Sequence, residues 1–134
     1  MNISFSKRFL FFLFICFLIY LQGVFKLPVM DRDEARFATA SKTMLIEKDF
    51  IDIKMVEEKR YKKPIGIYWT QSLMNSIFGS YPYDKISIYR LPSILGVFIS
   101  FFLIFVIIRN IENESIAFLT VFFLIFSFLT ISEI

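Results

Sequence analysis

Three charged side chains have types and positions suited to handling a phosphate group beside a membrane. Asp33 can accept a proton from a hydroxyl group. Arg36 offers a planar fork of N–H donors to phosphate oxygens, and Lys63 offers a compact point charge. Residues 31–36 directly follow an apolar stretch, so charges gather at a membrane boundary. The pattern favours a site that uses a lipid-phosphate substrate.

Each charged run also has a purely structural explanation. Acidic residues at the start of a helix accept backbone N–H bonds and complement the helix dipole, and an Arg three positions later pairs with them. The basic run 59–63 can attract anionic lipid at about 1 kcal/mol per cation near the surface. A basic patch does not account for Lys63 and Pro64 being followed closely by the aromatic pair Tyr68 and Trp69. On the residues alone, both explanations stay open.

The composition indicates a membrane protein. The 134 residues are 57% hydrophobic, include 19 Phe and have a mean hydropathy of +0.65, which is more apolar surface than a soluble domain of this length can bury. The net charge is +3, and most of the charged residues lie between the apolar runs and not on a soluble fold. We therefore expect no nucleic-acid partner. The chain has no His and one Cys, Cys16, which excludes a disulfide framework, a Cys/His zinc site and a His-based triad within it.

Three apolar runs are predicted to cross the bilayer: residues 9–27, 91–108 and 116–131. At ~1.5 Å per residue the first makes a helix about 28 Å long, close to the ~30 Å hydrocarbon core. The alternative for this run is a cleaved signal peptide, but residues 21–24 offer no pair of small residues for cleavage. Pro92 is expected in the first turn of the second span, where its missing N–H costs nothing.

The short flanks of the spans predict the orientation. Lys7 and Arg8 favour a cytoplasmic tail over residues 1–8. Residues 28–90 then form an external loop, and residues 109–115 form a tight cytoplasmic turn that joins the last two spans as a hairpin. The external loop is itself rich in basic residues, but the positive-inside rule weakens for loops of about 60 residues or more.

Four elements are predicted in the external loop: an amphipathic helix over 33–47, an extended stretch over 50–56, a charged turn over 57–63 and a second helix over 64–78 closed by Gly79. The first helix places Phe37, Ala40, Met44 and Leu45 on one face, and we expect it to lie along the membrane surface. The second carries Tyr68 and Trp69, aromatic residues that favour a membrane interface. The predicted fold class is an all-α integral membrane protein, with three transmembrane helices and amphipathic juxtamembrane helices in the first external loop.

Five landmarks in a fixed order resemble the GT-C membrane glycosyltransferases: residues 31–40, Met44–Leu45, Lys63–Pro64–Ile65 with Tyr68–Trp69, Phe78–Gly79, and Arg90–Leu91–Pro92–Ser93. The chain is most similar to the bacterial branch that includes the 4-amino-4-deoxy-L-arabinose lipid A transferase and the protein mannosyltransferase-like enzymes. The resemblance covers essentially the whole chain. It implies the N-terminal part of a GT-C fold, in a multi-pass protein of the bacterial inner membrane.

The resemblance also implies a reaction and a site. The sugar donor would be a polyprenyl-phosphate glycoside, and the acceptor a lipid A, a glycan or a protein. Asp33 and Glu34 match the catalytic carboxylate and its acidic neighbour, and Arg36 and Lys63 match positions that contact the carrier phosphate. Lys62 stands where relatives with the arabinose activity tend to carry a Glu that helps to bind a divalent metal. We therefore expect no metal site here.

Two hypotheses of function follow. The first is a glycosyltransferase fragment that is inactive alone, because the family has more spans and a C-terminal domain; its partner would be the remaining C-terminal part of a split transferase. The second is a small non-enzymatic membrane protein whose basic loop binds anionic lipid or a partner. The first depends on Asp33, whereas the second responds to the total number of cations.

Overall fold

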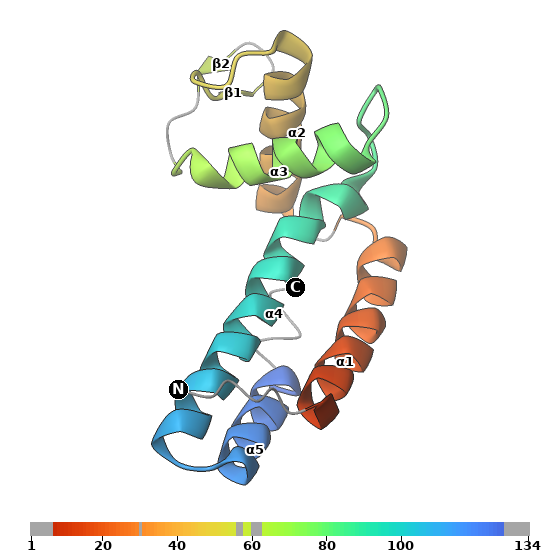
Figure 1. The fold of residues 1–134 in the computed structure, drawn as a ribbon. Helices are drawn as coiled ribbons and strands as arrows, with labels where there is room; N and C mark the ends of the chain where they lie inside the picture. The colour runs from red at the N-terminus through yellow and green to blue at the C-terminus, as the bar shows by residue number, and fades with distance from the viewer. Residues whose placement is uncertain (1–6, 30, 56–57, 60–62, 128–134) are drawn as a thin grey trace. The chain divides into compact units, whose positions relative to one another are not determined.

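The computed structural model describes residues 7–29, 31–55, 58–59 and 63–127. This part of the chain forms the following elements: α1 (Lys7–Lys26), α2 (Arg32–Glu47), β1 (Lys54–Met55), β2 (Glu58–Lys59), α3 (Gly66–Phe78), α4 (Ile86–Ile111) and α5 (Glu114–Ile125) (Figure 1). They belong to two compact units. The apolar unit contains residues 1–25 and 93–134, and the loop unit contains residues 26–92.

The apolar unit packs α1, α4 and α5 around aromatic side chains. Phe9 of α1 stacks on Phe105 of α4 with ring centroids 3.6 Å apart, and Phe12 contacts Phe118 of α5 at 5.0 Å. The buried core draws on all three helices: Phe9, Cys16, Val24, Ile94, Phe98, Phe101, Phe105, Ala117, Val121 and Ile125. Aromatic stacking therefore connects helices that are far apart in the sequence.

Two helices, α1 with 20 residues and α4 with 26, are long and apolar enough to cross a membrane. They agree with the predicted spans 9–27 and 91–108. Helix α5 is apolar but has 12 residues in the described part of the chain, and residues 128–131 of the predicted third span lie outside that part. The predominantly helical architecture is consistent with the predicted all-α fold class, whereas a third span remains a prediction.

The start of α4 differs from the expectation. The helix begins at Ile86, so Pro92 lies inside it, and the prediction that Pro92 occupies the first turn was wrong. Ile88 and Tyr89 lie before the apolar run that begins at residue 91, but they are only 5% and 3% exposed. Their packing stabilises a helix that starts earlier than this run. Pro92 cannot donate to the carbonyl of Ile88, so the helical ladder lacks one bond there.

The link between α4 and α5 is shorter than the predicted turn over 109–115. Helix α4 continues to Ile111, and α5 begins at Glu114. Asn113 caps α5, because its side-chain oxygen accepts the N–H of Ile116 at 3.0 Å. The cap explains where α5 begins.

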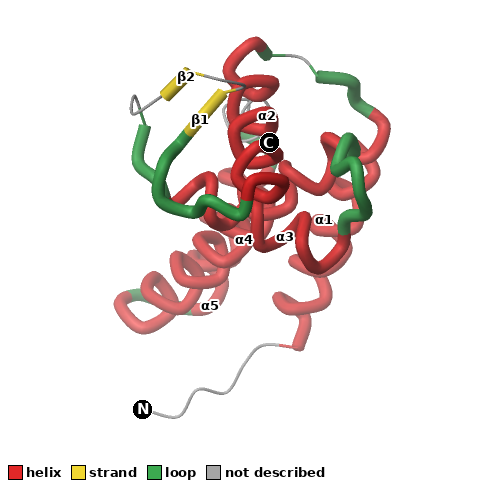
Figure 2. Tube along the Cα trace, turned by 90° about the horizontal axis from the view of Figure 1, so that it is seen from above, coloured by secondary structure: helices red, strands yellow, loops and turns green. Residues whose placement is uncertain are grey.

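The loop unit packs α2, α3 and the hairpin around a small core. Its buried apolar residues are Ala40, Met44, Ile53 and Tyr68, and the rings of Phe37 and Tyr68 lie 5.5 Å apart. Strand β1 lies beside α2 and pairs with β2 (Figure 2). Both predicted helices are therefore present, with α3 starting at Gly66, two residues after the predicted start at residue 64.

The segment between these helices differs from the prediction. The extended stretch predicted over 50–56 is a strand only at Lys54–Met55, and it pairs antiparallel with Glu58–Lys59, inside the predicted charged turn. The prediction of a turn at residues 58–59 was therefore wrong; residues 56–57 and 60–62 lie outside the described part. An ion pair also joins the two sides of the hairpin, because Lys59 Nζ lies 2.6 Å from Asp52 Oδ2.

Candidate functional site

Asp33 and Arg36 form an ion pair in the first turn of α2, a few residues after the end of α1. Arg36 Nη1 donates to Asp33 Oδ1 at 2.9 Å. This is the local pairing that the structural explanation predicts, since an acidic group at a helix start complements the dipole and an Arg three positions on can reach it. The Asp33 side chain is 48% exposed and that of Arg36 is 35% exposed. Both therefore remain accessible to a ligand.

Glu34, the neighbour of Asp33, is held by Arg90 of α4. Arg90 Nε donates to Glu34 Oε1, and Arg90 Nη2 donates to Glu34 Oε2 at 3.1 Å. The same guanidinium donates to the carbonyls of Leu27 and Pro28, each at 2.7 Å. Glu34 thus forms a forked ion pair inside the loop unit.

Arg90 is the important residue of this region that was not predicted from the sequence. It stood out there only as a landmark before Leu91 and as the charge that begins the second apolar run. In the structure Arg90 is 9% exposed and joins three segments of the loop unit: the link after α1, the first turn of α2 and the start of α4. One feature of the sequence could have pointed to Arg90: it is a single Arg at the edge of a long apolar run. A charge that is buried at such a position needs partners.

Lys63, the second predicted phosphate contact, is exposed and lies three residues before α3. It makes no hydrogen bond or ion pair with the described residues, Asp33 and Arg36 included. Lys62, the position on which the metal expectation rests, lies outside the described residues. Among the residues that are described, no three His, Cys, Asp or Glu side chains come together as metal ligands.

A layer of polar side chains is buried between α2 and α3. Ser41 Oγ donates to Gln71 Oε1 at 2.8 Å, and Ser72 Oγ donates to the carbonyl of Ser41 at 3.2 Å. Gln71 Nε2 donates to the carbonyl of Tyr89 at 3.2 Å, and Asn75 Nδ2 donates to that of Gln71 at 3.1 Å. Asn75 Oδ1 is buried without a hydrogen-bond partner among the described residues. This layer was not predicted from the sequence. Its residues in α3, Gln71, Ser72 and Asn75, are spaced so that they lie on one face of the helix.

Gly79 ends α3 against this layer. Its N–H donates to the carbonyl of Asn75 at 2.9 Å, and a Cβ at residue 79 would lie 2.5 Å from that same oxygen. The prediction that Gly79 closes the helix is confirmed, and the close approach of the Asn75 carbonyl explains why this residue has no side chain.

Asp49 lies just before the hairpin and makes several polar contacts with it. Its carboxylate accepts the N–H groups of Asp52 and Ile51 at 3.1 and 3.2 Å. These bonds, followed by the hydrogen bond and charge of Lys54, lower the pKa of Asp49 below its ordinary value. Lys54 pairs with both Glu47 and Asp49, which raises the pKa of Lys54.

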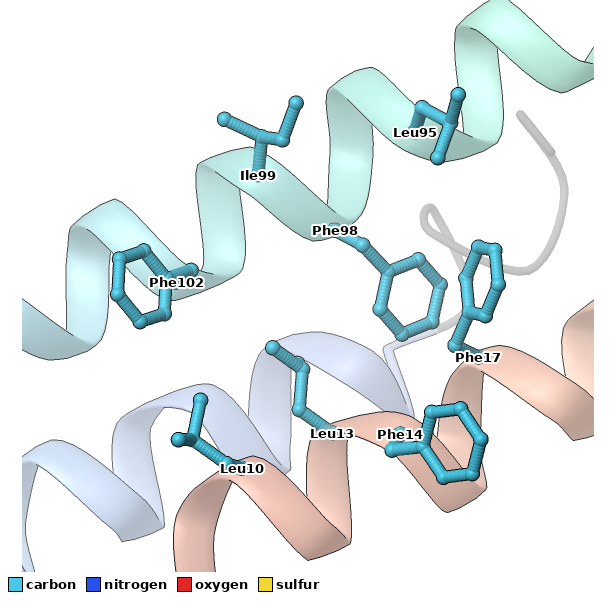
Figure 3. Close-up of a pocket in the computed structure, with 8 residues that line it drawn as sticks. All are labelled: Leu10, Leu13, Phe14, Phe17, Leu95, Phe98, Ile99 and Phe102. Atoms are coloured by element: carbon cyan, nitrogen blue, oxygen red, sulfur yellow. The ribbon is translucent and has the colours of Figure 1, made fainter. Parts of the chain in front are cut away.

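The apolar unit contains a groove between α1 and α4 with a volume of about 320 Å³ (Figure 3). Its lining is made of hydrocarbon side chains: Leu10, Leu13, Phe14, Phe17, Leu95, Phe98, Ile99 and Phe102. None of these side chains offers a charge or a hydrogen bond, so the groove has no catalytic chemistry.

The sequence of the chain is similar to those of known proteins. The family model described as dolichyl-phosphate-mannose-protein mannosyltransferase matches residues 62–132, slightly more than half of the chain. A relative, the undecaprenyl phosphate-alpha-4-amino-4-deoxy-L-arabinose arabinosyl transferase 2 of Proteus mirabilis (strain HI4320), is 29% identical over 87 residues, which are 64% of this chain. The matched region spans 15% of that relative's length. No solved structure matches the chain.

Proposed function

Because the chain belongs to the dolichyl-phosphate-mannose-protein mannosyltransferase family, we propose that it takes part in moving a sugar from a polyprenyl-phosphate carrier to an acceptor. The name of its relative specifies an undecaprenyl-phosphate sugar, which supports a lipid-linked donor. The acceptor would be a lipid A, a glycan or a protein. The proposed location is the bacterial inner membrane, with the N-terminus in the cytoplasm and the loop unit outside.

The observation that carries this proposal is the accessible Asp33–Arg36 pair at the start of α2. In the proposed reaction Asp33 accepts the proton of the acceptor hydroxyl as that oxygen bonds to the sugar. The bond from the sugar to the carrier phosphate breaks, and Arg36 and Lys63 stabilise the negative charge left on the phosphate. Glu34, held by Arg90, keeps the first turn of α2 in place beside Asp33.

The chain carries one wall of such a site. Glycosyl transfer requires the donor phosphate and the acceptor hydroxyl to be positioned together and water to be excluded. We propose that further segments of a complete transferase supply the other walls, as the much greater length of the relative suggests. The isolated chain would then bind polyprenyl phosphate but transfer no sugar.

Binding of undecaprenyl phosphate to the purified chain in lipid nanodiscs tests this proposal. A charge-assisted hydrogen bond contributes ~1.5–3 kcal/mol, so we expect Arg36→Ala and Lys63→Ala each to weaken binding by about 10- to 150-fold. Lys85→Ala is the matched control, because Lys85 is an exposed cation of the same unit. An equal loss in all three variants would instead indicate general attraction of the loop to anionic lipid and would contradict the proposal.

A further inference from the structure

The groove between α1 and α4 has a buried floor and an exposed rim, both made of hydrocarbon. Phe98, which is 6% exposed, belongs to the floor. Leu10, Phe14 and Ile99 are 40%, 57% and 59% exposed and belong to the rim (Figure 3). Because an apolar space of this kind does not hold water, its natural occupant is another apolar group.

The length of the groove matches one leaflet of a bilayer. Its lining from α1 extends from Leu10 to Phe17, which is ~11 Å along a helix. A single leaflet contributes about half of the ~30 Å hydrocarbon core. Leu10 lies in the first turn of α1, which begins at Lys7. The groove therefore belongs to the leaflet at the Lys7 end of this helix.

Ring contacts show that α1 and α4 run antiparallel along the groove. Phe9 stacks on Phe105 at 3.6 Å, and Phe17 meets Phe98 edge to face at 5.2 Å. Residue numbers therefore rise along α1 while they fall along α4. The start of α1 and the end of α4 lie at the same end of the groove.

Each of the two helices carries a cation at this end, on the face that lines the groove. Lys7 precedes Leu10 by three residues, and Arg109 follows Phe102 by seven. Residues three or seven positions apart lie on one face of a helix. The side chain of Lys7 is exposed and makes no hydrogen bond or ion pair with the part of the chain that the structure describes.

We propose that this groove binds an acyl chain of an anionic phospholipid from the leaflet at the Lys7 end, with Lys7 and Arg109 contacting the lipid phosphate. An apolar groove that ends at cations is complementary to a hydrocarbon chain with a negative headgroup. Glu112 and Glu114 are also near this end, but they follow α4 and so do not continue the helix faces that line the groove. In the predicted orientation this is the cytoplasmic leaflet.

The charges also favour a phospholipid over the sugar carrier of the proposed reaction. In the predicted topology Arg36 belongs to the external loop, on the opposite side of the bilayer from Lys7. Helix α1 alone, from Lys7 to Lys26, is ~28 Å long. A carrier whose phosphate is bound at Arg36 therefore does not place that phosphate at Lys7. The phospholipid site is independent of sugar transfer.

Native mass spectrometry of the full chain, released from detergent micelles, tests the proposal. The probes are phosphatidylglycerol, phosphatidylcholine with the same acyl chains, and undecaprenyl phosphate. We expect one phosphatidylglycerol to bind more tightly than phosphatidylcholine, and Lys7→Ala to weaken its binding about fivefold. Arg8→Ala is the matched control and should leave binding nearly unchanged, because Arg8 is the next residue of α1 and lies about 100° around the helix from Lys7.

Two outcomes of this measurement would overturn the proposal. Equal binding of the two phospholipids, or equal effects of Lys7→Ala and Arg8→Ala, would show that the cation on the groove face has no special role. Displacement of phosphatidylglycerol by an equal or lower concentration of undecaprenyl phosphate would show that the groove is a carrier site. Binding of undecaprenyl phosphate beside phosphatidylglycerol, without displacement, is the expected result.

A second pair of variants tests the groove itself. Ile99→Trp places a large ring on the rim and should abolish the tight binding of phosphatidylglycerol. Leu103→Trp makes the same change at a similarly exposed position of α4, where Leu103 is 52% exposed and does not line the groove, and should have no effect. Circular dichroism establishes that both variants keep their helical content. Tight binding that survives Ile99→Trp, or that is lost equally in both variants, would contradict binding in this groove.

Discussion

Arg90 donates to four acceptor atoms in the described part of the chain through one nearly buried guanidinium. Two of the acceptors are the carboxylate oxygens of Glu34, and two are backbone carbonyls, of Leu27 and Pro28. A planar fork is needed to reach all four. The geometry of the first turn of α2, and with it the place of Asp33, depends on this one side chain.

Removing Arg90 should therefore destabilise the loop unit strongly. Arg90→Ala leaves the Glu34 carboxylate without this partner, and because the Glu34 side chain is 23% exposed we expect a cost of about 1.5–3 kcal/mol, below that of a fully buried pair. Arg90→Lys should recover only part of this, because an ammonium group cannot form the fork. Urea unfolding of the purified chain in detergent, followed by Trp69 fluorescence, measures the loss. Arg32→Ala, at an exposed cation, is the control, and an equal loss there would refute this role of Arg90.

Gly79 is required for space, and a matched substitution tests this. A Cβ at residue 79 would meet the carbonyl oxygen of Asn75 at 2.5 Å, whereas a Cβ at Gly66 would meet nothing within 4 Å. Gly79→Ala should cost about 1–3 kcal/mol through overpacking. Gly66→Ala should be neutral or stabilising by up to about 1 kcal/mol, because Ala favours the helix. The same unfolding measurement compares them, and similar values for both would show that space at Gly79 is not limiting.

At the scale of elements, the helices were the predictable part of the fold. The spacing of Phe37, Ala40 and Met44 predicted α2, and Pro64 and Gly79 bounded α3 closely. The hairpin was not predictable, because two strands of two residues each are too short to show an alternating pattern in the sequence. The polar layer was missed for a different reason: its side chains are buried only because α2 and α3 meet.

The hairpin should lose stability in acid through Asp49. Hydrogen bonds from Asp52 and Ile51 lower the pKa of Asp49 in the folded protein, so its contribution is present above the unfolded pKa and is lost as pH falls through the folded pKa. Hydrogen exchange of the hairpin amides measured from about pH 5 downwards detects this loss. Asp49→Asn keeps the acceptor oxygen but cannot titrate, so its profile should be flatter. Identical profiles would contradict the assignment to Asp49.

At the scale of the whole molecule, the predicted topology has a direct test. The orientation depends on Lys7 and Arg8, and it places residue 80 outside and residue 112 in the cytoplasm. In a Cys16→Ser background, we expect an impermeant thiol reagent applied to intact cells to label Ser80→Cys but not Glu112→Cys. Both positions are exposed, so either would react if it faced the reagent. The opposite labelling pattern would invert the topology.

The site itself was only partly predictable from the sequence. Residue types and the resemblance pointed to Asp33 and Arg36, and the structure pairs them. The sequence could not show that Glu34 is occupied by Arg90, because the two are far apart in the chain and meet only after folding. Nor could it place Lys63 relative to that pair, since their relation depends on how the loop unit folds.

Asp33 is the residue on which the proposed sugar transfer depends. The most direct test of this dependence is transfer of radiolabelled sugar, from undecaprenyl-phosphate mannose and from undecaprenyl-phosphate 4-amino-4-deoxy-L-arabinose, in membranes of cells that produce the chain from its own locus. General-base catalysis contributes about 10²–10⁴-fold, so Asp33→Asn should lower transfer at least about a hundredfold with one of these donors. Asp84→Asn, at an exposed carboxylate paired with Lys42, should leave it unchanged. Undiminished transfer in the Asp33→Asn membranes would contradict the account.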